Sequence, residues 1–392
     1  MATIFEYNNF QSKFYFINRD FFGRLPFGFG GIIDLNRNFI GHNSSYNWKQ
    51  SNHNFSNQLQ VGYDLQWQND NRRRFENIEG EQGALTFHQQ ENFLNAAIFL
   101  VDNLKFKNWN IEGSLRYDFN NLAANDMILF NGDDSGDIQL NSLNGGVGIS
   151  HQVQPYFIPF TRFSTSFETP TLSELSANPM GTEGFNSTLN PISAINYEVG
   201  VKGLINNQLS FDVALYFIDT NNEILSFEIE AFPDRDFFRN AGKTQRIGFE
   251  TALKYQPSNP WQILSTYTFS NFTFEEPDVF NGAKLPGIPT HSGTISVRYL
   301  SETGLFFKLT GQQIGQLFAD DANSVTVDAF ALINLNLGYK ISAEKIQFTP
   351  FFGINNLLDT AYNDNIRINA FGSRYFEPAP GIHFFGGIRV RI

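Results

Sequence analysis

The last eleven residues of the chain, 382–392, read IHFFGGIRVRI and alternate between apolar and polar side chains. Successive side chains of an extended strand point to opposite faces of the sheet, so this stretch predicts a strand with two unlike faces. The apolar face carries Ile382, Phe384, Ile388, Val390 and Ile392, and the polar face carries His383, Arg389 and Arg391. The fold must therefore give one face a nonpolar environment and the other an aqueous one.

The same two-sided pattern recurs along the whole chain. It is clearest at 59–67, 111–119, 195–202, 247–255 and 333–340. Each predicted strand is roughly 9 to 14 residues long, which is enough to cross a bilayer at a tilt.

The connections between these strands alternate in length. Short links are predicted at 105–109, 153–156, 205–208, 256–260, 300–304 and 341–345. Long polar loops are predicted at 69–90, 120–137, 169–193, 221–243, 275–291, 315–327 and 359–379. Tight turns on one side and long loops on the other are typical of an outer-membrane barrel, with the turns periplasmic and the loops extracellular. Counting back from residue 392 predicts about sixteen strands, the first near 13–20.

A soluble β-sandwich is the main structural alternative, because its strands also alternate. Sandwich strands are usually about 5 to 6 residues long, and their loops follow no two-sided length rule. A closed barrel of about sixteen strands has a lumen too wide for side chains to fill, so its apolar face must point outward. The pattern therefore favours a membrane barrel.

Composition and charge exclude several classes of function. The chain has 44 Phe and 32 Gly but no Cys, which favours an all-β fold and excludes disulfides and cysteine-based zinc sites. A net charge of −12 disfavours a nucleic-acid partner. The six histidines are isolated, and no serine-hydrolase elbow, P-loop or dinucleotide motif occurs, so we expect no enzyme.

Six segments occur in an order that resembles the C-terminal barrel of TonB-dependent outer-membrane receptors. They are FETPTLSEL at 167–175, LNP at 189–191 with YEVG at 197–200, FRNAGKT at 238–244 with GFE at 248–250, LPGIP at 285–289, NNLLD at 355–359 and RYFEPAPG at 374–381. The resemblance covers 12–392. It implies an antiparallel transmembrane β-barrel in the outer membrane of a Gram-negative-type bacterium, and uptake of an iron-siderophore or similar chelate.

The chain also departs from this family pattern. The resemblance implies about twenty-two strands and a plug that contacts the TonB complex, whereas about sixteen strands are legible and neither a plug nor a TonB box is found. Residues 1–11 lack a basic region and an apolar core, which predicts no signal peptide and an atypical or truncated start. We therefore expect the C-terminal part of a receptor barrel. A general diffusion porin and a non-functional remnant remain alternatives.

Candidate ligand contacts lie in two of the predicted long loops, where guanidinium groups stand beside aromatic rings. Such a mixture suits a flat, anionic ferric chelate, although a solvated loop with interfacial aromatics has the same composition. The candidates are Arg235, Phe237, Phe238, Arg239, Arg367, Arg374 and Tyr375. No covalent cofactor or resident metal is expected, and the substrate is expected to be a ferric chelate.

Several other features have a structural reading beside a functional one. Arg72, Arg73 and Arg74 suit contact with outer-membrane lipid and lipopolysaccharide, or a solvated loop. The acidic stretch 131–137 suggests calcium but lacks the spacing of an EF-hand loop, so a turn-rich loop is favoured. The carboxylates expected on the polar face or in loops, where they either face a plug or are solvated, are Glu174, Glu198 and Glu250.

Overall fold

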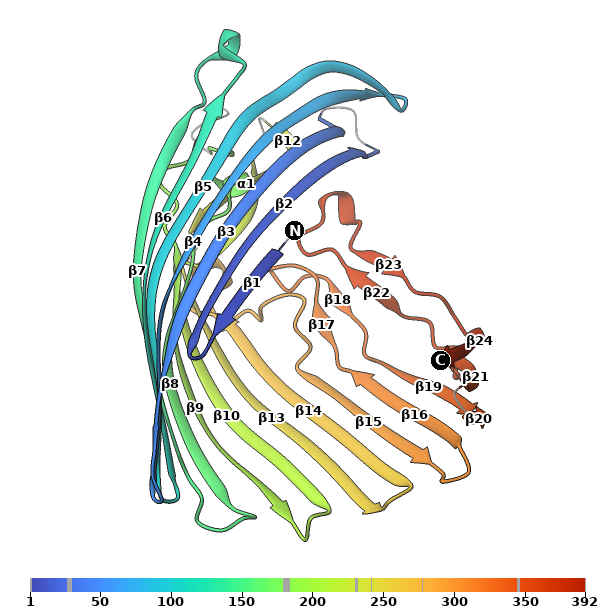
Figure 1. Ribbon diagram of the computed structural model, residues 1–392. Helices are drawn as coiled ribbons and strands as arrows, with labels where there is room; N and C mark the ends of the chain where they lie inside the picture. The colour runs from blue at the N-terminus through green and yellow to red at the C-terminus, as the bar shows by residue number, and fades with distance from the viewer. Residues whose placement is uncertain are drawn as a thin grey trace. The chain divides into compact units, whose positions relative to one another are not determined.

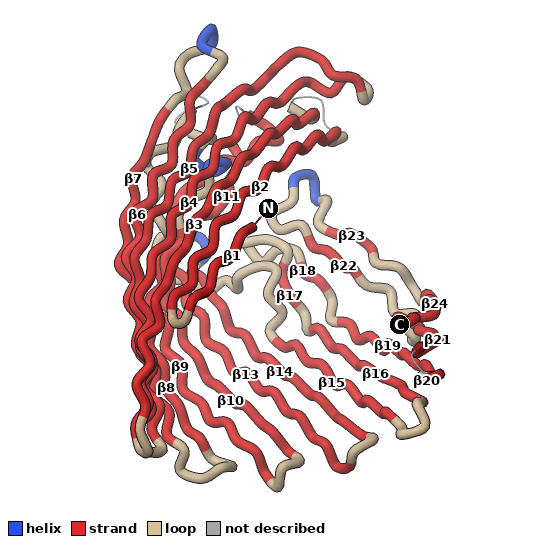
Figure 2. Tube along the Cα trace, in the orientation of Figure 1, coloured by secondary structure: helices blue, strands red, loops and turns tan. Residues whose placement is uncertain are grey.

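The computed structural model describes residues 2–26, 30–178, 184–229, 232–240, 242–276, 278–343 and 346–391. The chain divides into two compact units, which we describe separately. Unit 1 comprises Met1–Ile149, Phe163–Ile195 and Thr220–Gly242, and unit 2 comprises Ser150–Arg162, Asn196–Asp219 and Lys243–Ile392. Strands dominate the described chain, with helical turns at only a few places (Figure 2).

Unit 1 is built on long strands that pair in chain order. The ladders β1–β2, β2–β3, β3–β4, β4–β5 and β5–β6 are all antiparallel, and these strands run side by side in Figure 1. Its elements are β1 (Ala2–Tyr7), β2 (Phe10–Arg24), β3 (Ile32–Ser51), β4 (Phe55–Ile78), β5 (Glu81–Phe106), β6 (Trp109–Asp126), the 3-10 turn η1 (Leu129–Asn131), the helix α1 (Leu172–Leu175), β11 (Ile224–Ile229) and β12 (Phe232–Asn240). Strand β1 lies within the stretch 1–11 that was predicted to be an atypical start.

Four strands contribute residues to both units: β7 (Gly136–His151), β8 (Ile158–Glu168), β9 (Ile192–Ile205) and β10 (Leu209–Asn221). Unit 2 continues with the antiparallel series β13–β14–β15–β16–β19–β21–β24. These strands are β13 (Lys243–Ser258), β14 (Trp261–Phe274), β15 (His291–Leu300), β16 (Leu305–Ile314), β19 (Phe330–Tyr339), β21 (Ile346–Asn355) and β24 (His383–Arg391). The shorter elements are β17 (Leu317–Phe318), β18 (Thr326–Val327), β20 (Ile341–Ala343), β22 (Asn363–Ile366), β23 (Phe376–Pro378) and the 3-10 turns η2 (Asp278–Phe280) and η3 (Phe371–Ser373).

The strand count agrees with the sequence-based prediction. The main sheet has 18 strands within the described chain, of which β1 and β20 are short. The other sixteen begin with β2, which contains the predicted first strand, and end with β24, which coincides with the closing strand expected at 382–392. The helices of the described chain are all too short to span a lipid bilayer.

The two faces of the strands have the predicted chemistry. On β4 the apolar row is exposed, with Val61 49% and Leu65 46% accessible, while Asp70, an even-numbered residue of the opposite face, is completely buried. On β24, Ile388 is 68% exposed. These apolar rows do not meet in a dry interior, which contradicts a β-sandwich and agrees with strands that face lipid.

One prediction about connections was wrong. Residues 69–90 are not a long loop, because β4 continues to Ile78 and β5 begins at Glu81. The turn uses Glu79 and Gly80, both at positive φ, which favours a two-residue hairpin. This stretch is polar because its side chains interact across the strands, as in the contact of 3.0 Å between His88 Nε2 and Asn71 Oδ1. The stretch belongs to two strands that carry polar side chains on both faces, and such a composition does not differ from that of a polar loop.

Candidate functional site

The polar face of unit 1 carries buried ion pairs near the β4–β5 hairpin. Arg37 on β3 donates from Nε and Nη2 to both carboxylate oxygens of Asp70 on β4, at 2.6 to 3.1 Å. Gln68 Nε2 donates to the same carboxylate at 3.1 Å. The Asp70 side chain is 1% exposed. Because a buried carboxylate needs compensating donors, this fork-shaped pairing offsets the cost of burying Asp70 on the sheet.

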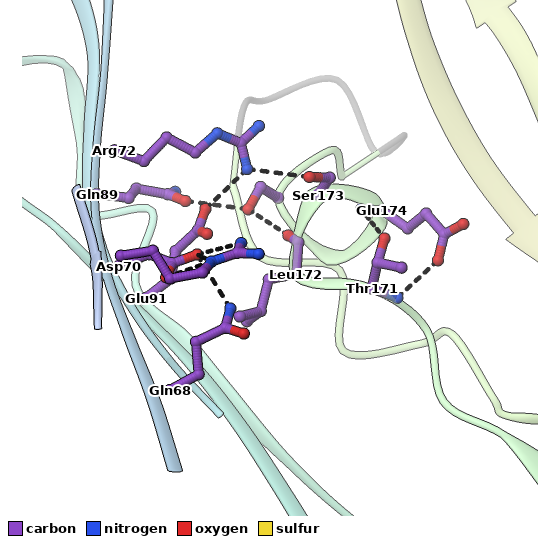
Figure 3. Close-up of polar contacts among 11 residues, drawn as sticks. Gln68, Asp70, Arg72, Gln89, Glu91, Thr171, Leu172, Ser173 and Glu174 are labelled. Atoms are coloured by element: carbon purple, nitrogen blue, oxygen red, sulfur yellow. Dashed lines mark hydrogen bonds and ion pairs between the residues drawn. The ribbon is translucent and has the colours of Figure 1, made fainter. Parts of the chain in front are cut away.

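A second pair connects the sheet to the segment that contains α1 (Figure 3). Arg72 Nη1 donates to Glu91 Oε1 at 2.9 Å and to Ser173 Oγ at 3.0 Å. Ser176 Oγ contacts Gln89 Oε1 at 3.0 Å and the Leu172 carbonyl at 2.7 Å. Two hydroxyls of the α1 segment therefore bind side chains of β4 and β5.

The α1 turn forms because its sequence supplies a capping box. Thr171 Oγ1 accepts from the Glu174 amide, and the Glu174 carboxylate accepts from the Thr171 amide at 2.7 Å. Leu175 is fully buried in a cluster with Leu122 and Leu189. The expectation for Glu174 as a loop carboxylate is thus refined, because its carboxylate caps the helix.

A third charged group lies further along the polar face of unit 1. Arg116 on β6 bridges Asp64, at 2.6 Å, and Asp118, at 2.9 Å. It lines a cavity of about 540 Å³ together with serine, threonine and amide side chains, including Ser44 and Thr165. Phe99, Leu100, Val101 and Leu115 also line it, so the cavity has both polar and apolar walls.

The first loop group of predicted ligand contacts lies on β12 in unit 1. The guanidinium of Arg239 stands 4.7 Å from the centroid of the Phe227 ring on β11. Phe237 is fully buried, with its ring centroid 6.3 Å from that of Phe227. Phe238 packs against the Leu122–Leu175–Leu189 cluster. The side chain of Arg235 lies outside the described residues. Of this group, Arg239 is exposed and Phe237 is enclosed.

The second loop group lies in unit 2, around the β22–β23 hairpin. The amide of Arg367 donates to the Tyr375 carbonyl at 2.9 Å, which holds the two residues side by side. The side chains of Arg367 and Arg374 are exposed, and Tyr375 is half-buried with its ring 6.2 Å from that of Phe376. This hairpin presents guanidinium and aromatic groups together.

Hydrogen bonds from asparagine and aspartate side chains connect the loops of unit 2, and the sequence analysis did not predict them. We call each reciprocal pair of such bonds a clamp. Asn323 accepts from the Lys284 amide at 2.7 Å and donates to the Lys284 carbonyl at 2.8 Å. Asn369 Oδ1 accepts from the Asp321 amide, and Asn369 Nδ2 donates to the Asp321 carboxylate, both at 3.0 Å. Burial, reinforced by the neighbouring Asp320, raises the pKa of Asp321 although the bond from Asn369 opposes the shift. The dipeptide Asp320-Asp321 beside Asn323 was the available signal.

The remaining candidates have plain structural partners. Arg73 Nη2 donates to Asp34 at 2.7 Å, and the Arg74 guanidinium lies 5.5 Å from the Phe87 ring centroid. Glu198 stands 4.0 Å from Arg162. Within the described residues, no group of three or more His, Cys, Asp or Glu side chains is arranged to hold a metal ion.

Comparisons with known proteins bear on this arrangement of strands and loops. A family model described as TonB dependent receptor-like, beta-barrel, matches residues 3–357. The ferrioxamine receptor of Yersinia enterocolitica is 22% identical over 286 residues, which cover 71% of this chain and 38% of that receptor. The ferrichrome outer membrane transporter/phage receptor of Escherichia coli K12 is 23% identical over 256 residues, covering 63% and 32%.

Solved structures of similar fold belong to larger chains. The unliganded ferric citrate transporter FecA superposes with a TM-score of 0.81 at 18% identity, over 99% of this chain and 60% of that one. The siderophore receptor PiuA from Acinetobacter baumannii gives a TM-score of 0.78 at 15% identity, over 97% and 61%. The chain thus spans less than two fifths of those two relatives and about three fifths of those solved chains. Its all-β antiparallel fold and the family match establish that it belongs to the β-barrel family of TonB-dependent receptors.

Proposed function

We propose that this chain is the barrel portion of an outer-membrane receptor that takes up a ferric siderophore or a similar iron chelate. The observation that carries the proposal is the presence of exposed arginines beside aromatic residues on two loop hairpins. In unit 1 the Arg239 guanidinium lies over the Phe227 ring, and in unit 2 a backbone hydrogen bond holds Arg367 next to Tyr375. Ferric chelates that are anionic and planar gain from charge and from stacking at once.

The residues of the two loop groups have different proposed roles in binding. The exposed guanidiniums of Arg239, Arg367 and Arg374 are available to a ligand that approaches from the loop side. Phe237 is fully buried, so its contribution is to position the strand that carries Arg239. Interaction with TonB, through a plug, belongs to the proposal and rests on the family match. Contact of Arg73 with lipid and lipopolysaccharide is part of the same proposal, because its side chain is 42% exposed, whereas Arg72 is 12% exposed and bonded to Glu91 and Ser173.

The test measures iron uptake by cells that express the complete gene and lack their own siderophore receptors. Radiolabelled ferrioxamine, ferric citrate and a ferric catecholate are offered in turn, in strains with and without TonB. We expect TonB-dependent uptake of at least one chelate. Uptake that persists without TonB, together with a stable conductance of the purified protein in a planar bilayer, contradicts the proposal and favours a diffusion porin.

Substitutions then identify the loop contacts. Arg239→Ala and Arg374→Ala are each expected to raise the half-saturating chelate concentration by about 1.5- to 5-fold, since an exposed charge or a cation–π contact is worth about 0.2–1 kcal/mol. Maximal uptake is expected to stay constant. The matched control is Lys105→Ala, which removes an exposed cation at the β5–β6 turn, on the opposite side from the loops.

A further inference from the structure

Both neighbours of Arg239 on β12 are bonded to the segment 186–190, which leads into β9. Phe238 and Asn240 lie on one face of β12 and Arg239 lies on the other, because side chains alternate along a strand. Asn186 Nδ2 donates to the Phe238 carbonyl at 3.3 Å, and the Phe238 ring packs against the cluster that contains Leu175. The position of Arg239 along β12 is therefore fixed on either side of it.

The carboxamide of Asn240 makes the second of these connections. Its Oδ1 accepts from the Asn190 amide at 2.7 Å, and its Nδ2 donates to the Asn190 carbonyl at 2.8 Å and to the Asn222 carbonyl at 2.9 Å. Both hydrogens of the side-chain amide are thus used. Asn190 precedes β9 and Asn222 lies between β10 and β11, so this clamp connects the end of β12 to the start of β9 and to the entry into β11.

The β11–β12 hairpin depends on anchors at its base. These two strands form a two-stranded sheet of their own within the described chain, and an isolated hairpin is marginally stable in water. The Arg239 guanidinium lies 4.7 Å from the centroid of the Phe227 ring on β11, so it moves with the hairpin. The Glu223 amide also donates to the Gly242 carbonyl at 3.1 Å, so loss of the Asn240 side chain should loosen the base without separating the strands.

We propose that Asn240 is a positioning residue for chelate binding, because it fixes the base of the β11–β12 hairpin and thereby the place of Arg239. This inference rests on the proposed function, since it takes Arg239 as a contact of the chelate. Asn240 acts through Arg239 and not on the ligand, because its carboxamide is engaged with backbone groups. Its removal should therefore weaken binding only while Arg239 is present.

Hydrogen exchange tests the contact itself, in the protein expressed from its complete gene and without a chelate. Asn240→Ala removes the acceptor of the Asn190 amide, which is expected to exchange about fivefold faster. A change of less than about twofold overturns the assigned hydrogen bond and the positioning role with it, whatever the result for iron uptake.

Uptake of radiolabelled ferrioxamine, ferric citrate and a ferric catecholate tests the positioning role. Asn240→Ala is expected to raise the half-saturating concentration of the transported chelate by about 1.5- to 5-fold, and by no more than Arg239→Ala does. Maximal uptake is expected to stay constant. In the double variant R239A/N240A, the half-saturating concentration should match that of Arg239→Ala within about 1.5-fold, because the guanidinium that Asn240 positions is absent.

Asn77→Ala is the matched control, because Asn77 makes the same kind of bonds near the β4–β5 turn of unit 1. Its Oδ1 accepts from the Gly80 amide at 2.7 Å, and its Nδ2 donates to the Leu25 carbonyl at 2.7 Å. This substitution is expected to leave both the half-saturating concentration and maximal uptake unchanged.

Three results overturn the inference. Lower maximal uptake at an unchanged half-saturating concentration means that Asn240 only supports folding or export. Effects that multiply in the double variant mean that Asn240 acts independently of Arg239. If Arg239→Ala alters the half-saturating concentration of none of the three chelates, the Arg239 contact fails together with this inference, while the TonB dependence of uptake still decides the proposed function.

Discussion

Leu175→Ala is expected to detach the α1 segment from the wall of unit 1. The Leu175 side chain is fully buried against Leu122 and Leu189, and side-chain hydrogen bonds from Arg72 and to Gln89 also connect the segment to β4 and β5. Replacing a buried leucine by alanine costs about 2–5 kcal/mol. Because the short helix can partly collapse into the space, we take about 3 kcal/mol, and a factor of ten per 1.4 kcal/mol gives faster opening by about a hundredfold.

Hydrogen exchange monitors this opening directly. The amides of Leu175, Ser176 and Asn186 all donate hydrogen bonds within the docked segment, so their exchange reports its opening. The substitution is expected to accelerate all three together. A rise of less than threefold contradicts the conclusion that Leu175 burial holds the segment in place.

Two controls accompany this measurement. Ser173→Ala removes only the bond from Arg72, worth about 1 kcal/mol, and is expected to accelerate exchange by about fivefold. Leu129→Ala changes the same residue type at a 64% exposed position in another connection and is expected to leave the three amides unaffected.

Three further substitutions test the other contacts. Arg37→Ala leaves the Asp70 carboxylate buried without its main donor and should lower the free energy of unfolding, measured with urea in micelles, by about 2 kcal/mol. This loss is smaller than the about 3–5 kcal/mol for a fully buried ion pair, because Arg37 is partly exposed. The double variant R37A/D70A should recover part of the loss. The raised pKa of Asp321 means that its ionised form opposes folding above the folded-state pKa. Intrinsic-rate-corrected exchange in the β17–β18 loop should therefore slow as the pH falls through the folded-state pKa toward the ordinary pKa of an aspartate, and Asp321→Asn should abolish that slope. Gly248→Val should slow refolding and lower yield, since the Tyr216 ring occupies the space of a Cβ at that position, and Tyr216→Ala should rescue it.

The strands, their faces and most of their connections could be predicted from local sequence, because the side-chain period of a strand is fixed by backbone geometry. Lys107, Asn206 and Asn207 take positive φ in turns that lie where short links were expected. The β4–β5 hairpin could not be recognised in this way. Residues 69–90, which form the end of this hairpin nearest its turn, are mostly polar on both faces. No row of apolar side chains therefore identifies them as strand.

Only part of the candidate site could be predicted from the sequence. Arg239, Arg367 and Arg374 are predicted ligand contacts because of their chemistry, and all three are exposed. The burial of Phe237 was not foreseeable from its neighbours, because it depends on the pairing of β12 with β11. The clamp between Asn369 and Asp321 joins residues 48 positions apart, and no spacing rule relates them.

The sequence by itself determined that this chain forms two-faced antiparallel strands, how many long ones it has, and the family to which its segments are similar, since alternation and turn chemistry are encoded locally. Only the tertiary structure decided which charges are paired and which are not. Arg37 and Arg72 meet carboxylates from neighbouring strands, whereas the side chains of Arg367 and Arg374 are exposed. That difference depends on strand register and on contacts between distant residues, which bring particular side chains within hydrogen-bonding distance and leave others facing open space.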